Sequence, residues 1–217
     1  MAVKVEVWGD YALFSRPELK AERMSYDVMT PSAARGLLEA VYWHPGLKWV
    51  IDRIYVLKPI RFATIRRNEV KSKISASNVR GAMNGGREPL YISTSDDIQQ
   101  RAALVLRDVR YVIEAHFDLT ENRAEGDNPG KFSDIMRRRL EKGQCYHQPC
   151  FGAREFPAQF RRWEGGGIET AYPDETRELG LMLYDFDYSD PGNITPTFFR
   201  ARLENGVLDL TDCEVLR

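Results

Sequence analysis

The chain has 217 residues, enough for one hydrophobic core and a small additional sheet. Its 31 Lys and Arg residues are balanced by 32 Asp and Glu residues, and the formal net charge of -1 excludes a general attraction to nucleic acid. Any basic binding surface must therefore be local. The three cysteines and the lack of an apolar signal segment predict a reducing, cytoplasmic compartment, and no apolar run reaches membrane-spanning length.

The stretch 25–45 carries the clearest helix signal. Thr30 is a favourable N-cap, Pro31 fits the first helical position, and Pro45 is expected to stop the helix. One buried helical face is predicted from the spacing of Ala34, Leu37, Leu38, Val41 and Tyr42. Tyr42 is therefore expected where this face ends.

Alternation of apolar and polar residues predicts strands over residues 3–14, 49–57, 60–67 and 105–119. The third of these strands is rich in arginine, and we expect it to form a basic hairpin. Residues 72–98 have weak periodicity and are predicted to be a mobile loop or an irregular hairpin tip. In the last strand, His116 falls on the polar side.

A second helix is predicted over 131–142 with Gly143 as its C-cap, and a further strand over 150–160. The order strand, helix, strand, strand, helix, strand indicates an α+β, ferredoxin-like domain of the RRM and RAMP type, which we assign to residues 1–163. Residues 164–217 are assigned to a C-terminal antiparallel β extension. Its strands are predicted over 179–188, 197–203 and 207–210, the last two joined through Asn205-Gly206.

His116 and Tyr42 each have both a functional and an ordinary structural interpretation. In a ferredoxin-like fold the helices cover one face of the sheet, and the other face is available for ligands. His116 is expected on that open face, where an imidazole can act as acid or base near neutral pH. An ordinary polar strand face explains His116 equally simply, and an ordinary core aromatic explains Tyr42.

Neither a metal nor a cofactor is expected. Cys145, His147 and Cys150 are irregularly spaced and have no fourth ligand in view. The sequence has no glycine-rich phosphate-binding motif and no nucleophile elbow. Arginine and lysine runs on the predicted hairpin and the second helix are the remaining features, although such runs are often only solvated faces.

Six segments carry a family resemblance: VWGDYALF (7–14), SYDVMTPSAARGLLEAVYWHP (25–45), IDRIYVLKPI (51–60), RRNEV (66–70), VIEAHF (112–117) and FGAREFPA (151–158). Together they resemble the type I-C CRISPR-associated RAMP proteins of the Cas5d family, over nearly the whole chain. The resemblance implies a prokaryotic protein that binds CRISPR repeat RNA and cuts the precursor transcript without metal. It also implies that the protein stays with the crRNA as a subunit of the type I-C Cascade complex.

The resemblance further implies residue roles. The family's catalytic tyrosine maps onto Tyr42 and its catalytic histidine onto His116. Family members carry a lysine beside that histidine, where this chain has Glu114 and Ala115. We therefore expect His44, or an arginine of the hairpin such as Arg61, to lie near the end of the first helix and stabilise the phosphorane. Glu114 is expected to favour a protonated His116.

The residues expected to bind RNA are Arg66, Arg67, Lys71, Lys73, Arg137 and Arg138. Three functions remain open at this point. The first is the metal-independent endoribonuclease, and the second is a non-catalytic crRNA-binding assembly subunit, which the missing lysine favours. The third is a metal-dependent nuclease that acts on DNA, for which the sequence offers no convincing carboxylate cluster.

Overall fold

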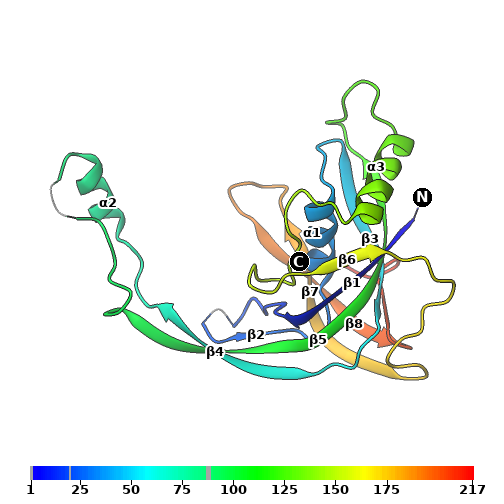
Figure 1. Cartoon of the computed structure of the whole chain (residues 1–217), viewed down its shortest axis with the longest axis horizontal. Coiled ribbons are helices and arrows are strands. Elements are labelled where there is room, and N and C mark those ends of the chain that lie inside the picture. Colours follow the sequence, from blue (N-terminus) through cyan, green and yellow to red (C-terminus); the bar gives the residue numbers. More distant parts are fainter. Residues whose placement is uncertain (1, 20, 87–88) are drawn as a thin grey trace.

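A computed structural model describes residues 2–19, 21–86 and 89–217. In these residues the chain forms a mostly antiparallel sheet and three helices (Figure 1). The elements are β1 (Val3–Ala12), β2 (Arg23–Met24), α1 (Pro31–Val41), β3 (Leu47–Val56), β4 (Phe62–Val70), α2 (Ala76–Met83), β5 (Ile98–Leu119), α3 (Pro129–Lys142), β6 (Gln159–Arg162), β7 (Thr176–Asp187), β8 (Thr195–Glu204) and β9 (Val207–Asp209).

The centre of the sheet has the order β6-β1-β5-β3, and every neighbouring pair in it is antiparallel. The order continues through β9 and β8 to β7. Because β9 pairs with both β3 and β8, the C-terminal strands extend the central sheet. The boundary expected at residue 163 falls in the connection between β6 and β7. No helix in the described part of the chain is both long and apolar enough to cross a membrane.

Helix α1 begins as predicted and ends earlier than predicted. The Thr30 hydroxyl accepts a hydrogen bond from the Ala33 N–H at 3.2 Å, and Pro31 is the first helical residue. The helix ends at Val41, so the chain has already left the helical conformation before Pro45. Tyr42 is the C-cap residue and is extended, with a φ of -147°.

The arginine-rich strand expected in a basic hairpin is β4, and its partner is the first half of β5. Strand β5 therefore starts at Ile98, seven residues before the predicted 105. Strand β4, the first half of β5 and the described residues between them form an arm that projects from the body (Figure 1). The irregular tip predicted for 72–98 is confirmed, but it also contains α2, which buries no residue.

The strand predicted over 150–160 is mostly a tight loop. Phe151 donates to the Phe156 carbonyl at 2.9 Å, and only the four residues of β6 pair with β1. Gly152 has a φ of +79°, and a Cβ atom there would overlap the Leu13 carbonyl oxygen. This close approach explains why the chain turns here and does not continue as a strand.

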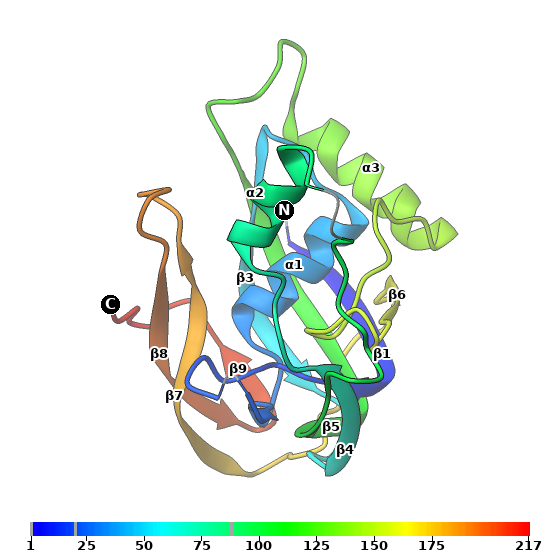
Figure 2. The same cartoon turned by 90° about the vertical axis from the view of Figure 1, so that its left-hand side faces the viewer.

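The C-terminal hairpin and the C-cap of α3 are as predicted. Asn205 and Gly206 both have positive φ, 52° and 75°, as a two-residue hairpin turn requires. Gly143 has a φ of 62° and follows α3 directly. Strands β7 and β8 curve beside α1 (Figure 2), and Arg35 on α1 donates to both carboxylate oxygens of Asp185, at 2.7 and 2.9 Å.

Candidate functional site

Backbone carbonyls at the carboxyl end of α1 accept hydrogen bonds from α3 and from the segment that follows α3. The Ala40 carbonyl accepts from the N–H groups of Tyr146 and His147, at 2.9 and 3.0 Å. The Val41 carbonyl accepts from the Arg139 guanidinium. These contacts satisfy carbonyls that a helix end leaves without intrahelical partners. They also bring α3 and residues 144–147 against Tyr42.

A pocket of about 640 Å³ opens at this junction, and we call it the Tyr42 pocket. It is lined by Tyr42, Trp43, His44, Pro45, Lys131, Ile135, Arg138, Arg139, Lys142, Gln144 and Tyr146. Four of the residues are lysines or arginines, and no Asp or Glu is among them. The structure therefore brings three predicted site residues together, namely Tyr42, His44 and Arg138.

Tyr42 is 5% exposed, and its ring lies under a cation. The Arg139 guanidinium is 5.0 Å from the ring centroid, and the Phe132 ring packs at 6.2 Å. Burial raises the pKa of the Tyr42 phenol, and the charges of Arg139 and Lys131 offset only part of this effect. The phenol therefore keeps its proton at neutral pH and is a hydrogen-bond donor.

His44 is held in one orientation beside Tyr42. Its Nδ1 atom accepts a hydrogen bond from the Gly46 N–H at 3.1 Å, and its ring packs 4.9 Å from Phe132. Asp127 lies 3.8 Å from the same nitrogen. A hydrogen bond from Lys131 at 2.8 Å lowers the pKa of Asp127, so this carboxylate is charged and fixes Lys131 at the pocket.

Sequence reasoning missed several residues of this pocket. Lys131 and Lys142 were not predicted, although they lie seven residues before and four residues after the predicted Arg138, which places all three on one helical face. This spacing was a usable signal. Trp43 and Tyr146 gave no such signal, because their positions depend on how α3 and the 144–147 segment meet the end of α1.

His116 lies on the other face of the sheet. Its neighbour Phe117 packs against Trp49 and against Phe132 on α3, with centroid distances of 5.6 and 6.0 Å. Successive side chains of a strand point to opposite faces, so His116 points away from the helices. The predicted open-face position is confirmed, and it separates His116 from the Tyr42 pocket.

The carboxylate beside His116 is that of Asp52, not that of Glu114. The His116 Nδ1 atom lies 2.8 and 3.0 Å from the two Asp52 carboxylate oxygens. Asp52 stands at a bulge in β3, and such irregularities re-aim a side chain. Glu114 instead accepts from the Tyr55 hydroxyl at 2.7 Å and pairs with Lys4 at 3.5 Å.

The arginines and lysines predicted on the basic hairpin lie on the arm and not near the end of α1. Arg66, Lys71 and Lys73 are exposed there, whereas Arg67 is paired with Glu155. The backbone of Arg61 pairs with Arg107, ten residues from Phe117 on the same strand. Ten strand residues span roughly 33 Å. The expected closeness of Arg61 to the end of α1 is therefore wrong, because β4 pairs with the outer half of β5.

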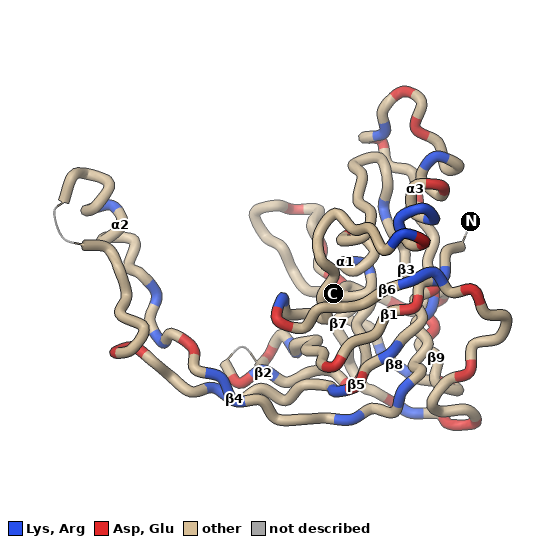
Figure 3. The backbone as a smooth tube through the Cα atoms, viewed as in Figure 1, with Lys and Arg blue, Asp and Glu red and all other residues tan. Residues whose placement is uncertain are grey.

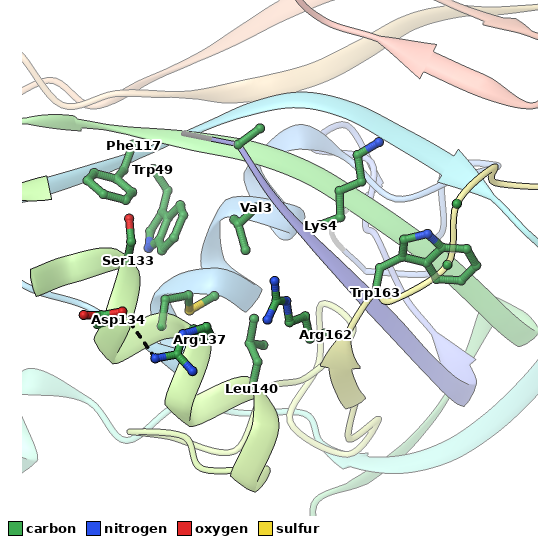
Figure 4. A pocket seen from close by; sticks show the side chains of 14 residues that line it. Val3, Lys4, Trp49, Phe117, Ser133, Asp134, Arg137, Leu140, Arg162 and Trp163 are labelled. Atoms are coloured by element: carbon green, nitrogen blue, oxygen red, sulfur yellow. Dashed lines mark hydrogen bonds and ion pairs between the residues drawn. The ribbon is translucent and has the colours of Figure 1, made fainter. Parts of the chain in front are cut away.

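Arg137 and Arg138, the cations predicted on the second helix, line two different pockets. Figure 3 shows the Lys and Arg residues along α3. Arg138 lines the Tyr42 pocket, whereas Arg137 lines a separate pocket of about 380 Å³ between α3, β1 and β6 (Figure 4). There Arg137 pairs with Asp134 at 3.3 Å and with Glu141 at 3.2 Å. Arg137 is thus already neutralised by its own helix.

Among residues 2–19, 21–86 and 89–217, no three His, Cys, Asp or Glu side chains lie close enough together to hold a metal ion. Cys145, Cys150 and Cys213 are free thiols of intermediate exposure.

Comparisons with known proteins give a consistent result. Residues 2–211 match the family Cas_Cas5d, described as CRISPR-associated protein (Cas_Cas5). A protein of Mannheimia succiniciproducens named CRISPR pre-crRNA endoribonuclease Cas5d is 52% identical over 213 residues, covering 96% of this chain and 94% of that protein. The protein of the same name from Thermus thermophilus is 39% identical, with 96% and 90% covered.

Solved structures share the fold. The structure titled Crystal Structure of CRISPR-associated Protein has a TM-score of 0.71 at 24% identity and covers 100% of this chain and 97% of that one. A functionally uncharacterized protein from Streptococcus mutans has a TM-score of 0.70 at 23% identity, with the same coverage. A chain of a CRISPR RNA-guided surveillance complex has a TM-score of 0.51 at 11% identity and covers 100% and 89%. With the family match over residues 2–211, these findings show that the chain belongs to the Cas5d family of CRISPR-associated proteins.

Proposed function

We propose that this protein is a metal-independent endoribonuclease that cuts the CRISPR repeat in precursor crRNA. The observation that carries the proposal is the 52% identity, over 96% of the chain, to a protein named for this activity. The Tyr42 pocket supports it, because a hydrogen-bond donor, a histidine and four cations converge there without a lining carboxylate.

The reaction needs no redox partner and no metal. The ribose 2′-oxygen attacks the adjacent phosphorus, and its proton passes to a base. The bond from phosphorus to the 5′-oxygen breaks, and that oxygen receives a proton from an acid. The products are a 2′,3′-cyclic phosphate and a 5′-hydroxyl. The extra negative charge of the phosphorane must be stabilised by donors and cations that are already in place.

Tyr42 is the donor in this proposal, because burial raises its pKa and keeps the phenol protonated. Its hydroxyl would orient the 2′-OH or donate to a phosphate oxygen. Arg138 and Lys131 would stabilise the phosphorane, in the role that a strand lysine fills elsewhere in the family. Arg139 is already engaged with the Val41 carbonyl and the Tyr42 ring, and it serves to position Tyr42.

Two histidines compete for the acid–base role. His116 is included because of the family resemblance and because Asp52 holds its Nδ1 atom, leaving Nε2 available to a ligand. His44 is included because it lines the Tyr42 pocket. Replacing each by alanine and measuring single-turnover cleavage assigns the role to the histidine whose loss abolishes the reaction.

The fold supports a ferredoxin-like assignment. We propose that β1, α1, β3, β5, α3 and β6 form a ferredoxin-like unit, with β7 to β9 as its extension. The support is the antiparallel order β6-β1-β5-β3, in which the first and third strands of the unit lie at the centre. The open face of this unit carries His116.

The arm is the surface we propose for contact with other subunits of the type I-C Cascade complex. Several large apolar side chains of the arm are exposed, and an exposed apolar surface indicates a protein partner. These side chains are Phe62, Val70, Ile74, Met83, Leu90, Tyr91 and Ile98. The exposed cations Arg66, Lys71 and Lys73 on the same arm would contact the crRNA or DNA phosphates held by those partners. The free cysteines fit a prokaryotic cytoplasm.

The deciding experiment uses purified protein and a labelled CRISPR repeat hairpin in excess chelator. A single cut that leaves a 2′,3′-cyclic phosphate is the expected result. Cleavage that returns only after a divalent metal is added would contradict the metal-free mechanism and favour a metal-dependent nuclease.

A non-catalytic crRNA-binding subunit is the second candidate function. The observation that favours it is the separation of His116 from the Tyr42 pocket by the sheet. In the same experiment, tight binding of the hairpin without any cut would select this function.

A further inference from the structure

Two exposed aromatic side chains at the Tyr42 pocket have no part in the chemistry proposed above. Trp43 is 56% exposed and Tyr146 is 66% exposed, and both line the pocket. Large aromatic rings normally bury most of their area, because burial is favourable. Their exposure next to a pocket leaves both rings free to contact a ligand, and the charge around the pocket indicates which kind.

The backbone that carries these two rings is held in place. The residue before Trp43 is fixed by Trp49, whose Nε1 atom donates to the Tyr42 carbonyl at 3.0 Å. Tyr146 is fixed through its own N–H, which donates to the Ala40 carbonyl at 2.9 Å. Both rings thus project from backbone that is tied to the end of α1. Binding of a ligand therefore costs little additional backbone conformational entropy.

The charge at the pocket selects the class of ligand. Lys131, Arg138 and Lys142 come from one face of α3, and no carboxylate lines the pocket. Aromatic faces combined with a positive groove are the means by which proteins bind single-stranded nucleic acid. The volume of about 640 Å³ lies within the range of small-ligand pockets and admits a nucleotide.

We propose that the Tyr42 pocket binds unpaired nucleotides, with their bases stacked on Trp43 and Tyr146 and their phosphates held by the α3 cations. This inference rests on the proposed function, since it places the unpaired nucleotides beside the phosphate that is cut. A base-paired nucleotide is already stacked on both sides within its helix, so it has no free face for either ring. The site therefore requires the RNA to be single-stranded at this position.

The test compares two RNA probes with the full-length protein. Affinities are measured for a single-stranded oligoadenylate and for a blunt RNA duplex of the same length. Trp43→Ala and Tyr146→Ala are each expected to weaken oligoadenylate binding roughly tenfold and to leave duplex binding unchanged. Arg138→Gln is expected to weaken binding of both probes, because it removes a phosphate contact.

The matched control is Tyr188→Ala. Tyr188 is 57% exposed on the far side of α1 from α3, in a pocket formed with β7. Its loss is expected to change neither affinity. Thermal unfolding of all the variants checks that folding is intact, which is expected because the replaced side chains are exposed. Equal losses for both probes, or no loss for oligoadenylate, would overturn the proposal.

A spectroscopic signal separates stacking from a general loss of affinity. Stacking of a base on Trp43 quenches its fluorescence, so oligoadenylate should quench the wild-type protein. Trp43→Phe is expected to keep the affinity, because phenylalanine also stacks, and to lose most of the quenching. Quenching that survives in Trp43→Phe would show that the base does not reach this ring.

This inference and the proposed function can fail separately. Oligoadenylate binding and quenching need no cleavage, so a protein that binds through Trp43 without cutting the repeat would refute only the endoribonuclease. A protein that cuts the repeat at the wild-type rate after loss of both Trp43 and Tyr146 would refute only the stacking site.

Discussion

The phenol of Tyr42 is protonated in the neutral pH range. Only 5% of the residue is exposed, and burial is the main reason that its pKa is raised above the ordinary value of about 10. A raised pKa means that the protonated form is favoured in the folded protein. Tyr42 can therefore donate a hydrogen bond across the neutral range, and it is not a general base there.

Replacing Tyr42 by Phe removes the donor and keeps the ring under Arg139. Cleavage of the repeat hairpin is expected to slow by about a hundredfold or more, the usual effect of losing one donor to a developing oxyanion. The shape of the pH–rate profile near neutrality should stay the same, because the phenol does not titrate there. Single-turnover rates over a range of pH test this. Tyr146→Phe, which removes a hydroxyl from the same pocket, is the control, and loss of a limb of the profile in Tyr42→Phe would contradict the donor role.

The contact between Asp52 and His116 makes a second prediction at this scale. The carboxylate holds Nδ1, and the His116 side chain is 38% exposed, so Nε2 can meet a ligand. If His116 is the acid–base residue, Asp52→Asn should lower cleavage at least about tenfold and alter the pH–rate profile, because the amide no longer selects one tautomer. Nitrogen NMR of the imidazole reports the tautomer directly.

Asp118 provides the matched control for this substitution. Its carboxylate is 4.0 Å from the His116 Nε2 atom and its side chain is 66% exposed, so Asp118→Asn should have little effect. A normal rate and profile in Asp52→Asn, together with an inactive His44→Ala variant, would transfer the acid–base role to His44.

At the scale of elements, the arm depends on one long strand. Strand β5 has 22 residues, of which the outer part pairs with β4 and the inner part pairs with β1 and β3. A two-stranded ribbon alone is marginally stable in water. The arm is therefore anchored by the continuity of β5 with the central sheet, and its exposed apolar residues remain available to a partner (Figure 1).

Charged substitutions on the arm should separate assembly from catalysis. Met83 is 80% exposed and Tyr91 is 70% exposed. Met83→Lys and Tyr91→Lys together are expected to leave thermal stability and hairpin cleavage unchanged and to weaken assembly with the other Cascade subunits. Co-purification of the tagged protein with those subunits measures this. Tyr188→Lys is the control away from the arm, and undiminished assembly of the arm variant would exclude the arm as the contact.

For the whole molecule, a net charge of -1 conceals strong local differences. Many cations are neutralised within the fold: Arg67 by Glu155, and Arg137 by Asp134 and Glu141. In the Tyr42 pocket Lys131 is paired with Asp127, which lies outside the lining, whereas no ion pair joins Arg138 or Lys142 to a carboxylate of the described residues. We therefore expect phosphate to be attracted locally, at this pocket and at the exposed arm cations Arg66, Lys71 and Lys73, on a protein that is nearly neutral overall.

Local chemistry was sufficient to predict several features of this protein. The cap at Thr30, the turn at Asn205-Gly206 and the C-cap at Gly143 each depend on the backbone and side chains of a few neighbouring residues. The polar and apolar sides of β5 follow from its period of two. Specific sequence segments were also sufficient to identify the family, because they resemble it over nearly the whole chain.

Tertiary structure alone decided which segments meet. An alternating strand can pair with several partners, so the sequence could not show that β4 pairs with β5 or that β9 joins β3 to β8. The same reason applies to the site. Whether Asp52 or Glu114 contacts His116, and whether Tyr42 and His116 share a face, depends on strand register and helix packing between residues far apart in the chain. Local propensities carry no information about such pairings, because the free energy that selects them comes from burying distant segments against each other.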